Sequence, residues 1–160
     1  MVCFVPWSSA SLIDVLVLAI LIVSFLILRI LGYAGVSIFA SWHASARDAL
    51  AVMLFFTGCS HFTTMRRDFI RMVPPWVPWP GAAVYFTGVC EVAGAVGLLV
   101  PALYRVAGVC LIIFFLAILP ANIHAARAGI TLRGRPATRL LVRIPMQILF
   151  IAWAWWSTLT

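Results

Sequence analysis

A nearly continuous apolar run from Leu12 to Leu31 is the feature that most limits how this chain can fold. Its length is close to the roughly 20 residues that a helix needs to cross the hydrocarbon core of a bilayer. Backbone polar groups in lipid must bond within their own segment, so the run is expected to be helical. No Lys or Arg precedes Arg29, and the run is longer than the apolar stretch of a signal peptide. We therefore interpret it as a retained membrane helix.

The composition extends this conclusion to the whole chain. Of the 160 residues, 65% are hydrophobic and 9% are charged, and the mean hydropathy is +1.15. A soluble domain has about 45–50% apolar and about 25% charged residues. Because a domain of this size leaves much of its surface exposed, so apolar a chain does not suit water. Soluble enzymes, secreted disulfide-rich domains, disordered proteins and DNA-binding modules are excluded, and the lipid bilayer is the expected partner.

Four further apolar segments are long enough, or nearly so, to cross the membrane. With the first run, they give predicted spans at about residues 12–31, 46–63, 81–100, 104–126 and 137–156. The predicted fold is an all-α, polytopic membrane protein with one transmembrane domain over residues 1–160. We expect all five segments to be transmembrane helices.

The basic residues predict the orientation of these spans. All eleven are Arg, against four acidic residues, which gives a net charge of +7. Most lie between the apolar segments, where they set orientation and contact anionic head groups, so no nucleic-acid partner is expected. The face that holds the N-terminus carries Arg66, Arg67, Arg71, Arg127, Arg133, Arg135 and Arg139, and the other face carries Arg29, Arg47 and Arg105. The positive-inside rule then puts the N-terminus in the cytoplasm and the C-terminus outside, in a membrane expected to be the bacterial inner (plasma) membrane.

The connection between the second and third spans is rich in proline and tryptophan. Residues 72–80 contain four Pro and two Trp. Proline removes hydrogen-bond donors, so this segment cannot be regular helix, and tryptophan favours the lipid–water boundary. We predict an interfacial cap across the cytoplasmic end of the bundle, formed by Pro74, Pro75, Trp76 and Trp79. The alternative is a linker that only anchors the chain at the interface.

Five strongly polar residues fall inside the predicted spans, where such residues are costly and usually face the bundle interior. They are His61, Glu91, Asn122, Arg143 and Gln147. The predicted topology puts all five in the cytoplasmic half, with Glu91 about 15 Å into its helix at roughly 1.5 Å per residue. They are our candidates for ligand binding or proton relay. The alternative is that they only specify helix packing.

The side of the third span that Glu91 occupies is rich in glycine. Gly88, Glu91, Gly94 and Gly97 recur every three residues, so they share one side of a helix. Small residues on one side permit close helix contact, which turns Glu91 toward the protein. An ion pair between Glu91 and Arg143 is predicted, because pairing is the cheapest way to hold both charges at low dielectric.

Two prolines lie inside the fourth and fifth spans, beside the polar residues. Pro120 and Pro145 each remove a helical hydrogen bond and favour a kink, and two kinked helices are typical of a cavity wall. Asn122 can alternatively bond the carbonyl that Pro120 frees. The cysteines show no C-x-x-C spacing, so no metal site is predicted. Haem ligation by His61 and His124 is not favoured, because hydrogen-bonded histidines are commoner than axial ligands.

Five short motifs occur in order along the chain. They are Gly58-Cys-Ser-His61-Phe62; Val73-Pro74-Pro75-Trp-Val-Pro78; Thr87-Gly88-Val-Cys-Glu91 with Gly94 and Leu98-Leu99-Val-Pro101; Pro120-Ala121-Asn122-Ile123; and Arg143-Ile-Pro145-Met-Gln147 with Trp153. Together they resemble the DoxX-like integral membrane family over about residues 48–156. The resemblance implies a four-helix transmembrane bundle, so the first of the five predicted spans is one extra N-terminal helix. That family includes a subunit of a thiosulfate–quinone oxidoreductase and distant receptor-assembly chaperones, so it implies no single activity.

Two functions fit these observations, and whether the protein is an enzyme stays open. The first is a redox-associated membrane subunit, quinone-linked or thiol/sulfur-linked, whose polar cluster holds a quinone head group and relays protons through Glu91 or His61. The alternative is a non-enzymatic assembly, chaperone or interaction protein with a protein partner or a second copy of itself. A small transporter fits less well, because the chain shows no internal repeat.

Overall fold

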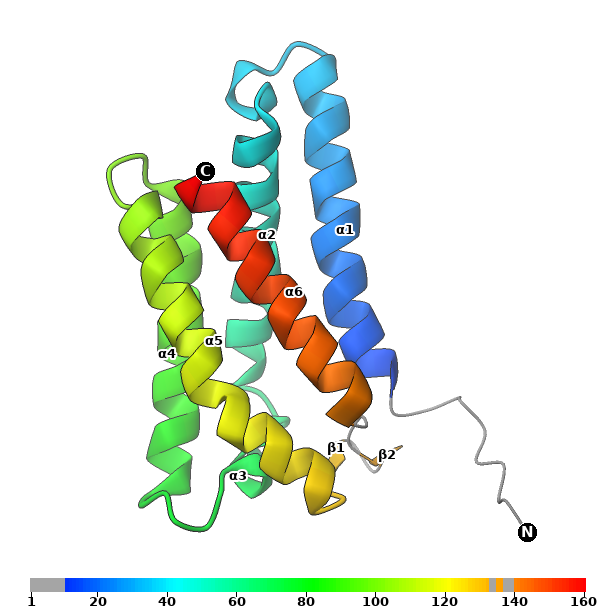
Figure 1. The fold of residues 1–160 in the computed structure, drawn as a ribbon, viewed down its shortest axis with the longest axis vertical. Coiled ribbons are helices and arrows are strands. Elements are labelled where there is room, and N and C mark those ends of the chain that lie inside the picture. The colour runs from blue at the N-terminus through cyan, green and yellow to red at the C-terminus, as the bar shows by residue number, and fades with distance from the viewer. Residues whose placement is uncertain (1–10, 133–134, 137–139) are drawn as a thin grey trace, which may run out of the picture.

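The chain folds into a bundle of long antiparallel helices (Figure 1). A computed structural model describes residues 11–132, 135–136 and 140–160. The elements are α1 (Ser11–Tyr33), the 3-10 helix η1 (Ser37–Phe39), α2 (Trp42–Ser60), α3 (Arg66–Met72), α4 (Pro80–Leu99), α5 (Tyr104–Arg127), β1 (Thr131–Leu132), β2 (Arg135–Pro136) and α6 (Leu140–Leu159). β1 and β2 form one antiparallel pair, with Thr131 opposite Pro136. The predicted helical bundle is confirmed.

Four of the helices are long and apolar enough to cross a membrane, as expected of an integral membrane protein. They are α1 from Val15 onward, α4, α5 and α6. Predicted spans 12–31, 81–100 and 104–126 follow α1, α4 and α5 closely. The start of the last predicted span, residues 137–139, lies outside the described residues. The predicted second span corresponds to α2, which does not belong to this group of four.

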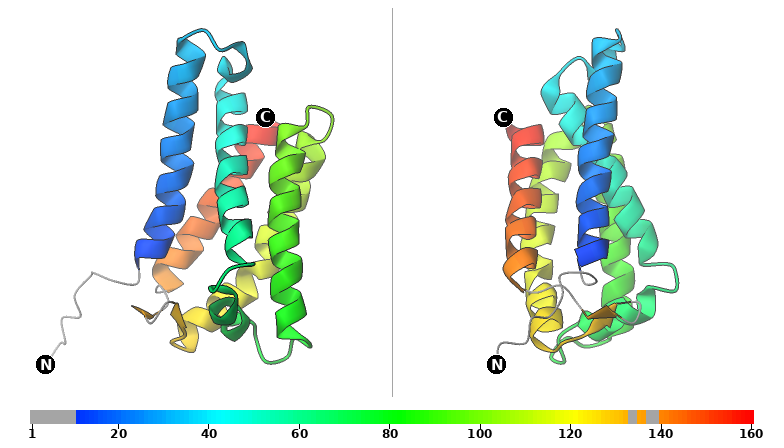
Figure 2. Two further views of the ribbon diagram at one scale, coloured as in Figure 1. Left: turned by 180° about the vertical axis from the view of Figure 1, so that it is seen from behind. Right: turned by 90° about the vertical axis from the view of Figure 1, so that its right-hand side faces the viewer.

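α2 is less apolar than these four helices, and one side of it is buried against its neighbours. It packs against α1, α4 and α6, and Figure 2 shows it between α1 and α4. Its buried residues include the polar Ser45 and Asp48 together with Leu50, Met53 and Leu54. Polar side chains in a membrane bundle are tolerated where they face other helices and not lipid.

Glycines bring α4 and α5 into close contact. A Cβ at Gly94 would lie 2.6 Å from Leu111 Cδ2, and one at Gly97 would lie 2.9 Å from the Cβ of Ala107. The prediction that the small residues of this helix form a packing face is therefore confirmed.

α6 is tied to the bundle by packing and by a hydrogen bond. A Cβ at Gly108 of α5 would clash with the hydroxyl oxygen of Thr158. The indole Nε1 of Trp153 donates to the Ala46 carbonyl of α2 at 2.9 Å. These contacts hold α6 against both α5 and α2.

The two ends of the bundle differ in content. α3 and the β1–β2 pair lie at one end, and η1 and the C-terminal end of α6 lie at the other (Figures 1 and 2). Arg66, Arg67 and Arg71 belong to α3. Arg127 ends α5 at the same end. Arg133 and Arg139 lie outside the described residues, and of Arg135 only the backbone, in β2, is described.

Arg29 fastens the connection between α1 and α2 at the end opposite α3. Its side chain is buried, with the residue 5% exposed. Nη1 donates to the carbonyls of Phe39 at 2.8 Å and Ala40 at 3.0 Å. The guanidinium carbon lies 4.5 Å from the ring centre of Trp42 and 4.6 Å from that of Tyr33. One side chain therefore bonds the turn and stacks on both helices.

Replacing Arg29 with methionine is expected to destabilise the protein by roughly 2–4 kcal/mol, because two carbonyls lose a charged donor and two rings lose a cation. Unfolding in detergent micelles, followed by circular dichroism, measures the change. Arg29→Lys should recover only part of the loss, because one ammonium cannot bridge both carbonyls and stack like a planar guanidinium. Wild-type stability in Arg29→Met would contradict this role.

Candidate functional site

Two adjoining cavities lie between the helices of the bundle, toward the α3 end. Their volumes are about 480 Å³ and about 150 Å³. Both are lined by Glu91, Asn122 and Arg143, so these side chains stand between them. The smaller cavity extends further along α2 and α6, to Met53 and Phe150.

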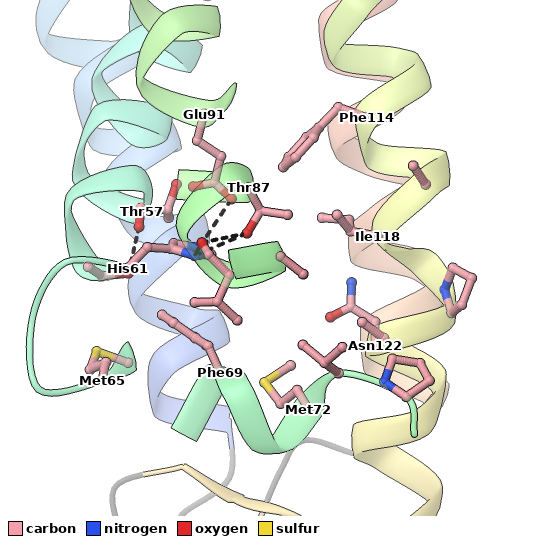
Figure 3. Close-up of a pocket in the computed structure, with 18 of the residues that line it drawn as sticks. Thr57, His61, Met65, Phe69, Met72, Thr87, Glu91, Phe114, Ile118 and Asn122 are labelled. Atoms are coloured by element: carbon pink, nitrogen blue, oxygen red, sulfur yellow. Dashed lines mark hydrogen bonds and ion pairs between the residues drawn. The ribbon is translucent and has the colours of Figure 1, made fainter. Parts of the chain in front are cut away.

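The five predicted polar residues all reach these cavities. His61, Glu91, Asn122 and Arg143 line the larger one, and Gln147 lines the smaller one. In Figure 3, His61 and Glu91 lie on one side of the larger cavity and Asn122 lies across from them. Four different helices, or their ends, thus contribute to one polar region. Its use in binding or proton transfer stays a prediction.

His61 and Glu91 form a pair between the end of α2 and the middle of α4. Nε2 of His61 lies 3.6 Å from Oε1 of Glu91. On the other side of the ring, Nδ1 lies 3.1 Å from the Val84 carbonyl oxygen. A carbonyl only accepts hydrogen bonds, so Nδ1 carries a hydrogen. Nε2, on the other edge of the ring, therefore faces the Glu91 carboxyl group.

Two glycines allow this pair to form. A Cβ at Gly88 would lie 2.6 Å from the Cβ of His61, and one at Gly58 would lie 3.1 Å from the Cβ of Glu91. The absence of side chains at these positions lets the end of α2 approach α4. The ring of Phe69, from α3, stacks on the imidazole with the ring centres 4.5 Å apart.

The predicted ion pair between Glu91 and Arg143 is wrong. Among the residues that the structure describes, the ion-pair partner of Glu91 is His61. Arg143 lies on α6, which packs on α5 and α2, whereas the glycines of α4 bring α2 next to Glu91. The packing of α2 on α4 therefore places the imidazole of His61, and not the guanidinium of Arg143, beside the carboxylate of Glu91.

Arg143 belongs to a second polar network, on the α5–α6 side. Its Nη1 donates to Oδ1 of Asn122 at 3.0 Å, and Nδ2 of Asn122 donates to Oε1 of Gln147 at 3.3 Å. Nε2 of Gln147 donates to the Phe115 carbonyl at 2.6 Å. Asn122 thus bonds side chains of α6, and not the carbonyl that Pro120 frees. Figure 1 shows α5 changing direction in its lower half, in keeping with a proline inside this helix.

Only two of the four residues predicted to form the interfacial cap lie at the larger cavity. Pro74 and Trp76 line the larger cavity, whereas Pro75 and Trp79 do not. Trp79 is 80% exposed and stands at the start of α4 with a left-handed backbone, at φ 52°. Its exposure suits the interfacial position predicted for it.

Sequence reasoning missed α3, which lies under the larger cavity (Figure 3). Met65, which precedes α3, lines the cavity together with Phe69 and Met72 of the helix itself. Phe69 and Met72 are three residues apart, so they share one side of the helix. That spacing within a segment rich in arginine was the available signal.

Three hydroxyl side chains of the larger cavity were also missed. Thr57 and Ser60 lie on α2, and Thr87 lies on α4. Hydroxyls are common in membrane helices, because they can bond a carbonyl of the preceding turn. The sequence therefore gives no signal that separates these three from others.

Comparison with known proteins places this site within a family. A family model described as a domain of unknown function, DUF8561, matches residues 50–158. The chain belongs to this family. The DUF8561 match contains all five polar residues and the segment predicted to form the cap, whereas α1 lies outside it. No curated protein and no solved structure matches the chain.

Proposed function

We propose that this protein binds a lipid-soluble ligand with a polar head group, of the quinone type, in the larger cavity, as a redox-associated membrane subunit. The observation that supports this is the gathering of polar side chains from four helices around one cavity in an apolar bundle. Small-molecule sites are mostly apolar cavities of roughly 300–1,000 Å³ with a few placed polar groups. A volume of about 480 Å³ falls in this range.

The lining of the cavity suits such a ligand chemically. Phe69, Phe114 and Ile118 offer apolar contacts for a ring and its tail. The amide of Asn122 can bond a ligand oxygen, and the His61–Glu91 pair can take up or release a proton beside it. The resemblance of residues 48–156 to the DoxX-like family favours a quinone among lipid-soluble ligands.

The proposal includes a five-span arrangement with α2 as a further membrane helix. α2 has 19 residues, which at roughly 1.5 Å per residue is close to 28 Å, near the thickness of the hydrocarbon core. The α3 end, with its arginines, then lies on the cytoplasmic side of the bacterial inner membrane. This orientation puts the N-terminus inside and the C-terminus outside.

A cavity-filling substitution tests ligand binding. In Ile118→Trp, the indole should occupy the larger cavity and weaken the binding of decylubiquinone at least about tenfold, which is roughly 1.4 kcal/mol. Binding to purified protein in lipid nanodiscs can be followed by quenching of tryptophan fluorescence and by native mass spectrometry.

The matched control for this experiment is Ile113→Trp. Ile113 lies on the same helix but is 61% exposed, so a tryptophan at this position should leave the quinone affinity unchanged. Equal affinities of Ile118→Trp and the wild type, or no saturable binding of either decylubiquinone or its reduced form by the wild type, would contradict the proposal.

An assembly or chaperone protein is the second candidate function. It is favoured by the network of Arg143, Asn122 and Gln147, whose members bond one another without any ligand. The same native mass spectra report this outcome, as a bound protein chain in place of a bound quinone.

A further inference from the structure

The hydroxyls on the α2–α4 side of the larger cavity point their hydrogens away from a ligand. Thr57 donates to the carbonyls of Met53 and Leu54, each at 3.2 Å. Thr87 donates to the Val84 carbonyl at 2.9 Å. Ser60 likewise donates to the Thr57 carbonyl. A hydroxyl has one hydrogen, so each of these three oxygens can only accept a bond from a ligand.

Glu91 adds the strongest acceptor to this wall. The residue is 8% exposed, and its Oε1 faces His61. Among the described residues, its Oε2 is buried and has no hydrogen-bond partner. Buried polar atoms are nearly always paired, so an unpaired one beside a cavity points to a ligand that donates a hydrogen bond. The Nδ1 hydrogen of His61 is already engaged by Val84, so the ring offers a ligand no competing donor there.

The α5–α6 wall of the cavity is different in character. It presents the guanidinium of Arg143, which only donates, and Nδ2 of Asn122, which has a second hydrogen besides the one donated to Gln147. The positive charge of Arg143 disfavours a cationic ligand in the same cavity. A suitable ligand is therefore neutral, donates at Glu91 and accepts on the opposite wall.

We infer that the larger cavity selects a neutral hydroxyl-bearing head group, such as a hydroquinone, over the corresponding quinone. This inference rests on the proposed function, in which the cavity binds a lipid-soluble ligand. One ring hydroxyl donates to Oε2 of Glu91, and the second ring oxygen accepts from the side of Asn122. A quinone carries only carbonyl oxygens, which would place lone pairs against the acceptors of the α2–α4 wall.

The test compares decylubiquinol with decylubiquinone, which share the same tail, in anaerobic titrations of the protein in nanodiscs. The wild type should bind the quinol at least about tenfold more tightly. In Glu91→Gln the side-chain amide can donate as well as accept, so the preference should shrink to within about twofold. Ile113→Ala, on the exposed side of α5, should keep the wild-type preference.

A second variant covers the case in which Glu91→Gln does not fold. Thr87→Val removes one acceptor of the wall with little change of shape. It should weaken the binding of the quinol and strengthen, or at least not weaken, that of the quinone, whose carbonyl oxygens then face one acceptor fewer. The reverse pattern, or equal loss for both forms, would overturn the inference.

The outcomes separate the inference from the proposed function. Equal affinity of the wild type for both forms, or a preference that survives in Glu91→Gln, overturns the inference and leaves ligand binding in place. Failure of both forms to bind saturably overturns the proposed function itself.

Discussion

Replacing Gly88 with alanine is expected to destabilise the protein by about 1–3 kcal/mol, because the new methyl group overpacks the contact between α2 and α4. Its carbon would lie 2.6 Å from the Cβ of His61 and 3.1 Å from the Cγ. A Cβ cannot swing away as the end of a flexible side chain can, so the end of α2 must shift. Unfolding in detergent micelles measures the loss.

Gly81→Ala is the matched control on the same helix. A Cβ at Gly81 would meet its nearest neighbours, in Arg66 and Ile70, at 3.7 and 3.8 Å, which is ordinary contact. Its stability should equal or slightly exceed that of the wild type, because alanine is the better helix former. Equal losses in both variants would show that the close approach at His61 is not the cause.

The Gly88 variant should also separate His61 from Glu91. Because the clash falls on the Cβ that carries the imidazole, the ring must move from its place between Val84 and Glu91. The imidazole signals of His61 in NMR spectra of the labelled protein should therefore shift, and those of His43, at the opposite end of the bundle, should not. His43 bonds the Trp156 carbonyl of α6, far from this contact.

Replacing Asn122 with leucine is expected to cost roughly 2–4 kcal/mol, because two bonds of a buried network are lost together. Arg143 loses the oxygen to which its Nη1 donates, and Oε1 of Gln147 loses its donor. Chemical unfolding in mixed micelles gives the change in free energy.

Asn122→Asp tests the bond to Arg143 and the bond to Gln147 separately. Aspartate keeps an acceptor for Arg143 but places an oxygen against Oε1 of Gln147. Its stability is therefore expected to fall between those of the wild type and the leucine variant. If the leucine variant were as stable as the wild type, the network would make no net contribution to the free energy of unfolding. Replacement of buried polar groups by apolar ones is neutral in some other proteins.

Much of the candidate site could be predicted because depth in a membrane follows from position along a helix. Once the spans alternate in direction, the residue numbers of His61, Glu91 and Asn122 place them near one level, and the structure brings them to one cavity. The glycines around Glu91 likewise predicted which way its side chain faces. Both conclusions need only the helix repeat and the order of the spans.

The partner of Glu91 could not be predicted in this way. Which cation reaches a buried carboxylate depends on interhelical distances of a few ångströms, and these are set by Gly58 and Gly88. Only Gly88 belonged to the stripe that drew attention to Glu91, and nothing local links Gly58 to the same contact. The glycine spacing thus predicted the side of α4 on which Glu91 lies, whereas interhelical packing determines its ion-pair partner.

α3 escaped prediction for a different reason. Its seven residues are too few to show a clear helical period, and the prolines that follow predict irregular structure. Its arginines are interspersed with the apolar Phe69 and Met72, so the segment does not stand out as apolar. Only the position of the segment across the end of the bundle shows that these apolar side chains face a cavity.

The central place of α2 has a consequence for biosynthesis. In the five-span arrangement, α2 with its Arg47 and Asp48 is the helix that hydrocarbon accepts least readily. α1, the most apolar candidate span, leaves the ribosome before α2 and is joined to it by the turn that Arg29 holds. We therefore expect α2 to enter the bilayer as the second arm of a helical hairpin, so that the order of synthesis lets a poorly inserting segment reach the centre of the bundle.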